Sequence, residues 1–164
     1  MDDAPQLVVM SGLPGVGKST LAGALAQKIG ALWLRIDSIE DALADSTLHI
    51  HPADDAGYLA ACAVARDNLG GLRTVIADAV NPDDWCRTLW RDLAAETDAR
   101  LTPIQVVCSD TDEHRRRVAA RDRGPDWQGV LTRGAEPWPG APVIDTAHHS
   151  VDAAVMKMEE LLNA

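Results

Sequence analysis

The sequence predicts an α/β fold in which helices cover both faces of a parallel sheet. Two observations support this prediction: short apolar runs alternate with longer segments of helical period, and a glycine-rich turn at 12–19 joins the first run to the first such segment. Strands that alternate with helices in this way usually lie parallel. The length of 164 residues predicts a single domain, 1–164.

Each expected element follows from its local pattern. The apolar runs predict strands near 6–11, 31–36, 73–79, 102–108 and 142–145. The segments between them predict helices near 18–29, 55–70, 83–98, 110–122 and 150–163, with a short helix at 39–45. In the first helix, Leu21, Leu25 and Ile29 keep a helical spacing beside Ala22 and Ala26, so these side chains are expected in the core.

One long connection, 124–141, has no evident pattern and is rich in proline. Because long connections are often functional and this one follows an arginine-rich helix, we expect a mobile lid, with a passive loop as the alternative. Trp127 and Trp138 fall within it and are candidates to cover a ligand. Trp33, Trp85 and Trp90 are expected to pack against the sheet.

The turn itself reads Gly-Leu-Pro-Gly-Val-Gly-Lys-Ser and matches the phosphate-binding pattern G-x-x-x-x-G-K-[ST]. Its glycines allow backbone N–H groups to point at phosphate oxygens, and the following helix adds its positive end. Lys18 is expected to reach the β- and γ-phosphates and Ser19 to hold Mg²⁺. The alternative is a glycine turn before an ordinary helix. The expected nucleotide contacts are Gly12, Leu13, Pro14, Gly15, Val16, Gly17, Lys18, Ser19 and Thr20.

Two aspartates follow predicted strands, where ligands bind in parallel α/β sheets. Asp37 is the candidate catalytic base, because a carboxylate there can accept a proton from a hydroxyl. The alternative is helix capping, by Asp37 or Ser38, of the helix expected at 39–45. Asp78 is the candidate magnesium-linked carboxylate, with a structural role as the alternative. Asn81, just beyond it, is placed to touch an acceptor.

The arginine-rich helix offers cations to a phosphoryl group. Arg117 and Arg121 lie four residues apart and so share one helix face, and Arg123 begins the expected lid. Arginines so placed can neutralise charge during phosphoryl transfer, which makes Arg121 a catalytic candidate. The alternative is a solvated helix face whose charges pair locally.

Composition excludes several classes. The formal charge of −10 argues against a nucleic-acid partner. The three cysteines have no metal-ligand spacing, and neither they nor the paired histidines, His49 with His51 and His148 with His149, predict a zinc site. The acidic start at 1–5 and the lack of a long apolar run predict a cytoplasmic protein without a membrane segment.

The chain resembles the small P-loop kinases of the AAA-like predicted-kinase group, which is similar to chloramphenicol phosphotransferase, zeta toxins and gluconate kinase. The resemblance rests on Gly12 to Ser19, Ile36-Asp37-Ser38, Val75 to Ala79, Arg117 to Arg121, Glu136-Pro137-Trp138 and Val143 to Thr146. It implies a three-layer sandwich with a five-stranded parallel sheet in the order 2-3-1-4-5, and transfer of the γ-phosphoryl group from ATP with Mg²⁺ to a hydroxyl.

The resemblance also implies roles for particular residues. Asp37 matches a proposed base, Arg117 an arginine that stacks on adenine, and Arg121 an arginine that reaches phosphates. Asp145 and Thr146 begin the loop expected beside the adenine. Segment 39–72, where relatives build the acceptor pocket, matches no member of known substrate, so the acceptor stays open. No ring-motor arginine finger or sensor region is evident.

Two function classes follow. The first is a kinase of a small hydroxylated acceptor, indicated by Asp37 and the lid arginines. The second is a nucleotide-binding regulatory module with slow ATP hydrolysis, because switches, motors and kinases share the phosphate-binding loop. A nucleic-acid end kinase is disfavoured by charge. The sequence determines neither the oligomeric state nor a preference for ATP over GTP.

Overall fold

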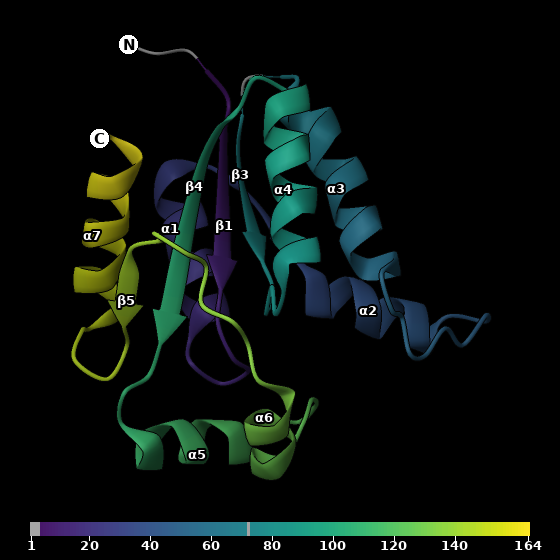
Figure 1. Ribbon diagram of the computed structural model, residues 1–164, viewed down its shortest axis with the longest axis vertical. Coiled ribbons are helices and arrows are strands. Elements are labelled where there is room, and N and C mark those ends of the chain that lie inside the picture. The colour runs from purple at the N-terminus through teal and green to yellow at the C-terminus, as the bar shows by residue number, and fades with distance from the viewer. Residues whose placement is uncertain (1–3, 72) are drawn as a thin grey trace.

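One parallel sheet forms the centre of the molecule. The computed structural model describes residues 4–71 and 73–164, so residues 1–3 of the acidic start lie outside the described residues. The strands are β1 (Gln6–Ser11), β2 (Leu32–Arg35), β3 (Thr74–Asp78), β4 (Arg100–Val107) and β5 (Val143–Asp145). All pairings are parallel, in the order β2-β3-β1-β4-β5, which confirms the predicted topology (Figure 1).

Helices cover both faces of this sheet. They are α1 (Lys18–Ile29), α2 (Ile36–Asp45), α3 (Ala56–Leu69), α4 (Asp84–Glu96), α5 (Thr111–Ala119), α6 (Trp127–Arg133) and α7 (Val151–Leu162). Helices α1 and α7 lie on one face, and α3 and α4 lie on the other (Figure 1). Among the described residues, no helix combines the length and apolar character that crossing a membrane requires.

Strand β1 shows how the sequence builds two cores. Its side chains alternate between the faces, so Val8 and Met10 join the cluster under α1 and α7, while Leu7 and Val9 join the cluster under α3 and α4. All four are fully buried. A strand with both faces buried reads as a continuous apolar run, which is why β1 is easy to recognise from the sequence.

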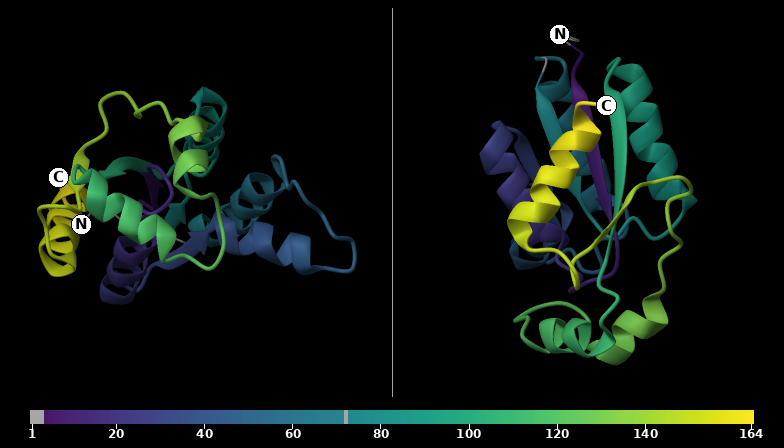
Figure 2. Two further views of the ribbon diagram at one scale, coloured as in Figure 1. Left: turned by 90° about the horizontal axis from the view of Figure 1, so that it is seen from below. Right: turned by 90° about the vertical axis from the view of Figure 1, so that its left-hand side faces the viewer.

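Helices α5 and α6 form a hairpin beyond the carboxyl ends of the strands (Figures 1 and 2). The turn between β1 and α1 lies at the same edge (Figure 1). Because parallel strands all end there, this edge is where an α/β sheet exposes ligand-binding groups. The hairpin therefore stands over the candidate site.

The connection 124–141 is more ordered than the sequence indicates. It contains α6, whose N-cap Asp126 accepts a hydrogen bond of 2.8 Å from the backbone N–H of Gly129. Its second half packs on the body of the protein, since the Glu136 N–H donates to the Pro82 carbonyl. A whole-length lid at 124–141 does not fit these contacts. The part that overhangs the site ends near Arg133.

The five tryptophans divide differently from the expectation. Trp138 was expected over a ligand, but it is 5% exposed and belongs to the core under α3 and α4. Trp90 is fully buried, as expected, while Trp33 and Trp85 are 39% and 47% exposed. Trp127 packs edge to face on His114 at 5.0 Å between ring centroids and so joins α6 to α5. The position of a residue within a loop does not show whether its side chain faces the core or the solvent.

Candidate active site

The glycine-rich turn forms a compact loop under α5. Gly15 has φ of 84°, and a Cβ there would lie 2.6 Å from Val118 Cγ2 on α5, so only glycine fits. His114 on the same helix contacts the Pro14 carbonyl through Nε2 at 2.8 Å. We call the hairpin of α5 and α6 the lid hairpin. Its first helix, α5, is therefore attached to the loop.

Lys18 begins α1 and points back into the loop. Its side chain is buried, and Nζ donates a hydrogen bond of 3.0 Å to the Leu13 carbonyl. Burial lowers the pKa of Lys18 to about 8, although the charges of Asp78 and Asp37 oppose this shift. A buried ammonium with one acceptor is well suited to a phosphate anion.

A cleft of about 250 Å³ opens on this loop. Its lining residues are Pro14, Gly15, Gly17, Lys18, Ser19, Thr20, Arg35, Asp37, Val80, Arg117 and Arg121. We call it the loop cleft. It brings together the loop, the predicted base and both helix-face arginines. Leu13 and Val16 face the core instead, packing under α1 and α7.

The oxygen donors expected to hold magnesium are Ser19 and Asp78. Ser19 lines the loop cleft, and Asp78 ends β3, where its side chain is 2% exposed and accepts a hydrogen bond of 3.2 Å from Trp33 Nε1. Hydroxyl and carboxylate oxygens suit Mg²⁺, which binds few protein groups and keeps several waters beside substrate phosphates. Ser19 and Asp78 therefore supply oxygen atoms of the kind that suits this ion, and of the two only Ser19 lines a cleft.

Asn81 has a structural role rather than the acceptor contact expected of it. Its side chain is 1% exposed, donates to the Met10 carbonyl at 3.0 Å and accepts from Trp90 Nε1 at 2.8 Å. Its backbone N–H donates to the Tyr58 hydroxyl at 3.1 Å. These bonds fix the chain after β3 and hold the Asn81 side chain in the interior.

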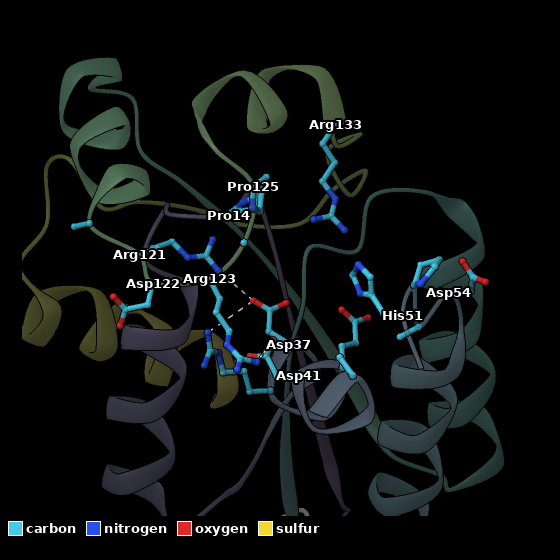
Figure 3. Close-up of a pocket in the computed structure, with 17 residues that line it drawn as sticks. Pro14, Asp37, Asp41, His51, Asp54, Arg121, Asp122, Arg123, Pro125 and Arg133 are labelled. Carbon is cyan, nitrogen blue, oxygen red and sulfur yellow. Dashed lines mark hydrogen bonds and ion pairs between the residues drawn. The ribbon is translucent and has the colours of Figure 1, made fainter. Parts of the chain in front are cut away.

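A larger cleft of about 970 Å³ lies between α2 and the lid hairpin (Figure 3). We call it the wide cleft. Its charged lining residues are Arg35, Asp37, Glu40, Asp41, Asp54, Arg121, Asp122, Arg123 and Arg133, together with His51. A lining of this kind suits a polar molecule with several hydrogen-bonding groups. Segment 39–72 contributes Glu40, Asp41, His51 and Asp54 to it.

Asp37 stands where the two clefts meet. It lines both, and its Oδ2 lies 3.4 Å from Arg121 Nη2 and 3.7 Å from Arg35 Nη2. The helix at this position begins earlier than expected, at Ile36, so Asp37 lies in its first turn. The capping alternative is wrong, because Arg35 occupies the N-cap position without a side-chain cap bond. Asp37 Oδ2 is therefore engaged by two guanidinium groups rather than by the N-terminus of α2.

Arg117 and Arg121 take different partners. Arg117 donates from Nη1 to Thr146 Oγ1 at 2.8 Å and to the Val16 carbonyl at 3.4 Å, and Nε donates to Glu113. Arg121 reaches across to Asp37 instead. Helix α5 ends at Ala119, earlier than expected, so Arg121 lies just after the helix rather than on its face. Arg117 and Arg121 nevertheless both line the loop cleft. Arg123 pairs with Asp41 and Asp45 on α2.

The segment expected beside the adenine lies behind the loop and lines neither cleft. Thr146 Oγ1 donates to the Val16 carbonyl at 2.7 Å, which ties the end of β5 to the loop. Asp145 Oδ1 accepts hydrogen bonds of 3.0 Å from the backbone N–H groups of Ser109 and Ala147. These bonds give both residues a role in holding the shape of the site.

Sequence reasoning missed several residues of the clefts, among them Arg35, Glu40 and Arg133. Arg35 lines both clefts, and Glu40 and Arg133 line the wide cleft (Figure 3 shows Arg133 reaching down into it). Burial raises the pKa of Glu40, with the charge of Asp37 adding to the shift. Arg35 was detectable, since it precedes Asp37 by two residues at the same strand end. Glu40 and Arg133 carry no local signal.

Within residues 4–71 and 73–164, no group of three or more His, Cys, Asp or Glu side chains is arranged to hold a metal ion. His51 lines the wide cleft, and His148 Nε2 contacts Ser109 Oγ at 3.2 Å.

Comparison with known proteins supports the fold and adds a family. A family described as "AAA domain" matches residues 7–130, more than half of the chain. The chain belongs to this family. Uncharacterized proteins of Mycobacterium bovis and Mycobacterium tuberculosis are 33% identical over 132 residues, which cover 73% of this chain. The chain spans only 26% of the length of these curated relatives.

Solved structures place this family member among P-loop kinases by fold. A protein of Chloroflexus aurantiacus described as a candidate kinase has a TM-score of 0.80 at 20% identity, covering 99% of this chain and 98% of that one. The APS kinase of Mycobacterium tuberculosis, in complex with AMPPNP and APS, has a TM-score of 0.72 at 18% identity, covering 98% and 99%. A gluconokinase of Sinorhizobium meliloti reaches 0.64 at 18%, covering 98% and 97%. This chain has the small P-loop kinase fold.

Proposed function

We propose that the protein transfers the γ-phosphoryl group of ATP, bound with Mg²⁺, to a hydroxyl group of a small molecule. The observation that supports this most is the position of Asp37 and Arg121, which line both the loop cleft and the wide cleft. A donor in the first cleft and an acceptor in the second would meet at these two side chains. Phosphoryl transfer depends on such positioning.

The chemical step needs one base and several cations. The acceptor oxygen forms a bond to the γ-phosphorus, the bond from that phosphorus to the β–γ bridging oxygen breaks, and the hydroxyl proton passes to Asp37. The products are ADP and the phosphorylated acceptor. Lys18 and Arg121 stabilise the charge that spreads over the transferred group.

Other residues hold the nucleotide. The loop from Gly12 to Thr20 would cradle the phosphates, and Ser19 with Asp78 would hold Mg²⁺ directly or through water. When bound, the ion neutralises phosphate charge and orients the terminal phosphate. Arg117 would lie beside the nucleotide at the rim of the loop cleft, with Asp145 and Thr146 fixing the adjoining loop.

The wide cleft supports a small, hydroxylated acceptor. It is large enough for a sugar, a nucleoside or a small antibiotic, and its lining carries both hydrogen-bond donors and acceptors. Among the proteins of similar fold, an APS kinase solved with APS and a gluconokinase are consistent with an acceptor of this size class. The low sequence identity leaves the acceptor itself to experiment.

The test is release of ADP from Mg-ATP in the presence of a panel of sugars, nucleosides, amino alcohols and hydroxylated antibiotics. We expect one class to raise turnover, and Asp37→Ala to lower the raised rate by about 10²- to 10⁴-fold while nucleotide still binds. Lys18→Ala should weaken nucleotide binding. Asp92→Asn, which changes an exposed carboxylate on α4, is the matched control and should leave turnover unchanged.

A different outcome would favour the regulatory module. If nucleotide binds tightly, no compound raises turnover, and Asp37→Ala leaves slow hydrolysis as it was, then Asp37 is not a base. The protein would then be a nucleotide-dependent binding module.

A further inference from the structure

The candidate base is held by two guanidinium groups at once. Asp37 Oδ2 contacts Arg121 from the lid hairpin and Arg35 from the end of β2 (Figure 3 shows Asp37 with its two dashed contacts). The two guanidinium groups share this one carboxylate.

Both arginines also face the position expected for a nucleotide's terminal phosphate. Arg35 and Arg121 line the loop cleft together with Lys18. Arg35 Nε and Arg121 Nη1 are buried and have no hydrogen-bond partner among the described residues. A buried N–H group without a partner costs free energy, so a phosphate oxygen that comes within reach of it binds favourably.

We propose that Arg35 and Arg121 exchange Asp37 for the terminal phosphate of a nucleotide, and that Arg35 is thus a second phosphate-binding arginine of this site. The inference rests on the proposed function, because it needs a triphosphate in the loop cleft. A phosphate carries more charge and more acceptor oxygens than one carboxylate, so it competes well for both guanidinium groups.

The exchange would couple the two clefts. While both guanidinium groups hold Asp37 Oδ2, that oxygen is occupied and poorly placed to accept a proton from an acceptor hydroxyl. Once the phosphate draws them away, the carboxylate faces the wide cleft without a competing partner. The nucleotide would therefore prepare the base, and the acceptor would bind productively after it.

Calorimetric titration with AMPPNP and Mg²⁺ tests this without knowledge of the acceptor. Asp37→Asn keeps the shape of the side chain and removes its charge, so the arginines no longer have to leave an ion pair. We expect AMPPNP to bind about threefold to tenfold more tightly, the scale of partly exposed ion pairs. ADP lacks the terminal phosphate and should show a smaller change. Arg35→Gln should weaken binding of AMPPNP more than binding of ADP.

Two controls separate the exchange from a general effect of charge. Asp45→Asn removes a carboxylate from the same helix that pairs with Arg123 and lines neither cleft, so affinity for AMPPNP should stay the same. In a background carrying Arg35→Gln and Arg121→Gln, the effect of Asp37→Asn should disappear, because no guanidinium group is left to release.

The outcomes are distinct. If Asp37→Asn weakens binding of AMPPNP, or tightens it equally in the background without Arg35 and Arg121, the exchange is wrong. If the wild-type protein binds AMPPNP and shows acceptor-stimulated turnover while Asp37→Asn leaves the affinity unchanged, only the exchange fails. If the wild-type protein binds no AMPPNP, the proposed function fails with it.

Discussion

Lys18 illustrates how burial sets the chemistry of one group. Its ammonium is largely removed from water, and this burial lowers its pKa to about 8, against the opposing effect of two nearby carboxylates. A phosphate placed beside the ammonium would favour the charged form and hold the proton. Nucleotide binding and protonation of Lys18 are therefore linked.

This linkage predicts a pH dependence with a definite sign. Below a pH of about 8 the ammonium is already charged, so affinity for ADP should not change with pH. Above a pH of about 8, binding must take up a proton, so affinity for ADP should fall by up to tenfold per pH unit. Phosphate groups titrate near pH 6 and do not contribute in this range. Calorimetry from about pH 7 to 9.5, in buffers of different ionisation heat, measures both the fall in affinity for ADP and the proton uptake on binding.

Lys18→Gln is the control for this prediction. It should bind ADP weakly at every pH and show no proton uptake. A wild-type affinity that stays constant through pH 9.5 would contradict the assignment of the shift to a phosphate-binding lysine.

At the scale of elements, the lid hairpin and the segment after it have different roles. Helix α5 is attached to the loop through His114 and the close approach of Val118 to Gly15, and Trp127 joins α6 to α5. Trp138, although close in sequence, lies in the core with Arg91 over its ring at 5.3 Å. A boundary near Arg133 therefore separates ligand-facing chain from core.

Two tryptophan variants test this boundary. Trp138→Ala should lower the free energy of unfolding by about 3–5 kcal/mol, because it empties a large buried volume, and it should leave nucleotide affinity in the folded protein unchanged. Trp127→Ala should lower the free energy of unfolding by about 1 kcal/mol, the scale of an aromatic pair. It should also speed hydrogen exchange in α6. Urea unfolding measures the loss of stability, and mass spectrometry measures the hydrogen exchange. A larger loss of stability in Trp127→Ala than in Trp138→Ala would contradict the boundary.

At the scale of the whole molecule, charge limits the partners. The net charge of −10 repels a polyphosphate backbone, and three arginines near the site pair with carboxylates: Arg117 with Glu113, Arg121 with Asp37, and Arg123 with Asp41 and Asp45.

We therefore expect no binding of oligonucleotides. Fluorescence anisotropy with labelled single-stranded and double-stranded DNA and RNA should show no change at low salt with micromolar protein, and Mg-ATP should leave the result unchanged. A complex that weakens steeply as salt is added would contradict this and would favour a nucleic-acid end kinase.

The sequence by itself determined the sheet, its covering helices and the loop. Apolar runs buried on both faces and helices with a regular apolar stripe are local patterns, and the loop needs its glycines and lysine in consecutive positions, so all of these can be read along the chain. Asp37 was also identifiable, because the end of a parallel strand is a position that the local pattern gives.

The tertiary structure alone decided the start of α2 at Ile36, the burial of Trp138 and Asn81, and the meeting of Asp37 with Arg35 and Arg121. Arg121 lies 84 residues from Asp37 in the chain, and only the folded hairpin brings it across the site. The physical reason is that side chains far apart in sequence have no local pattern in common. Their contact depends on how the helices and strands pack in the folded protein.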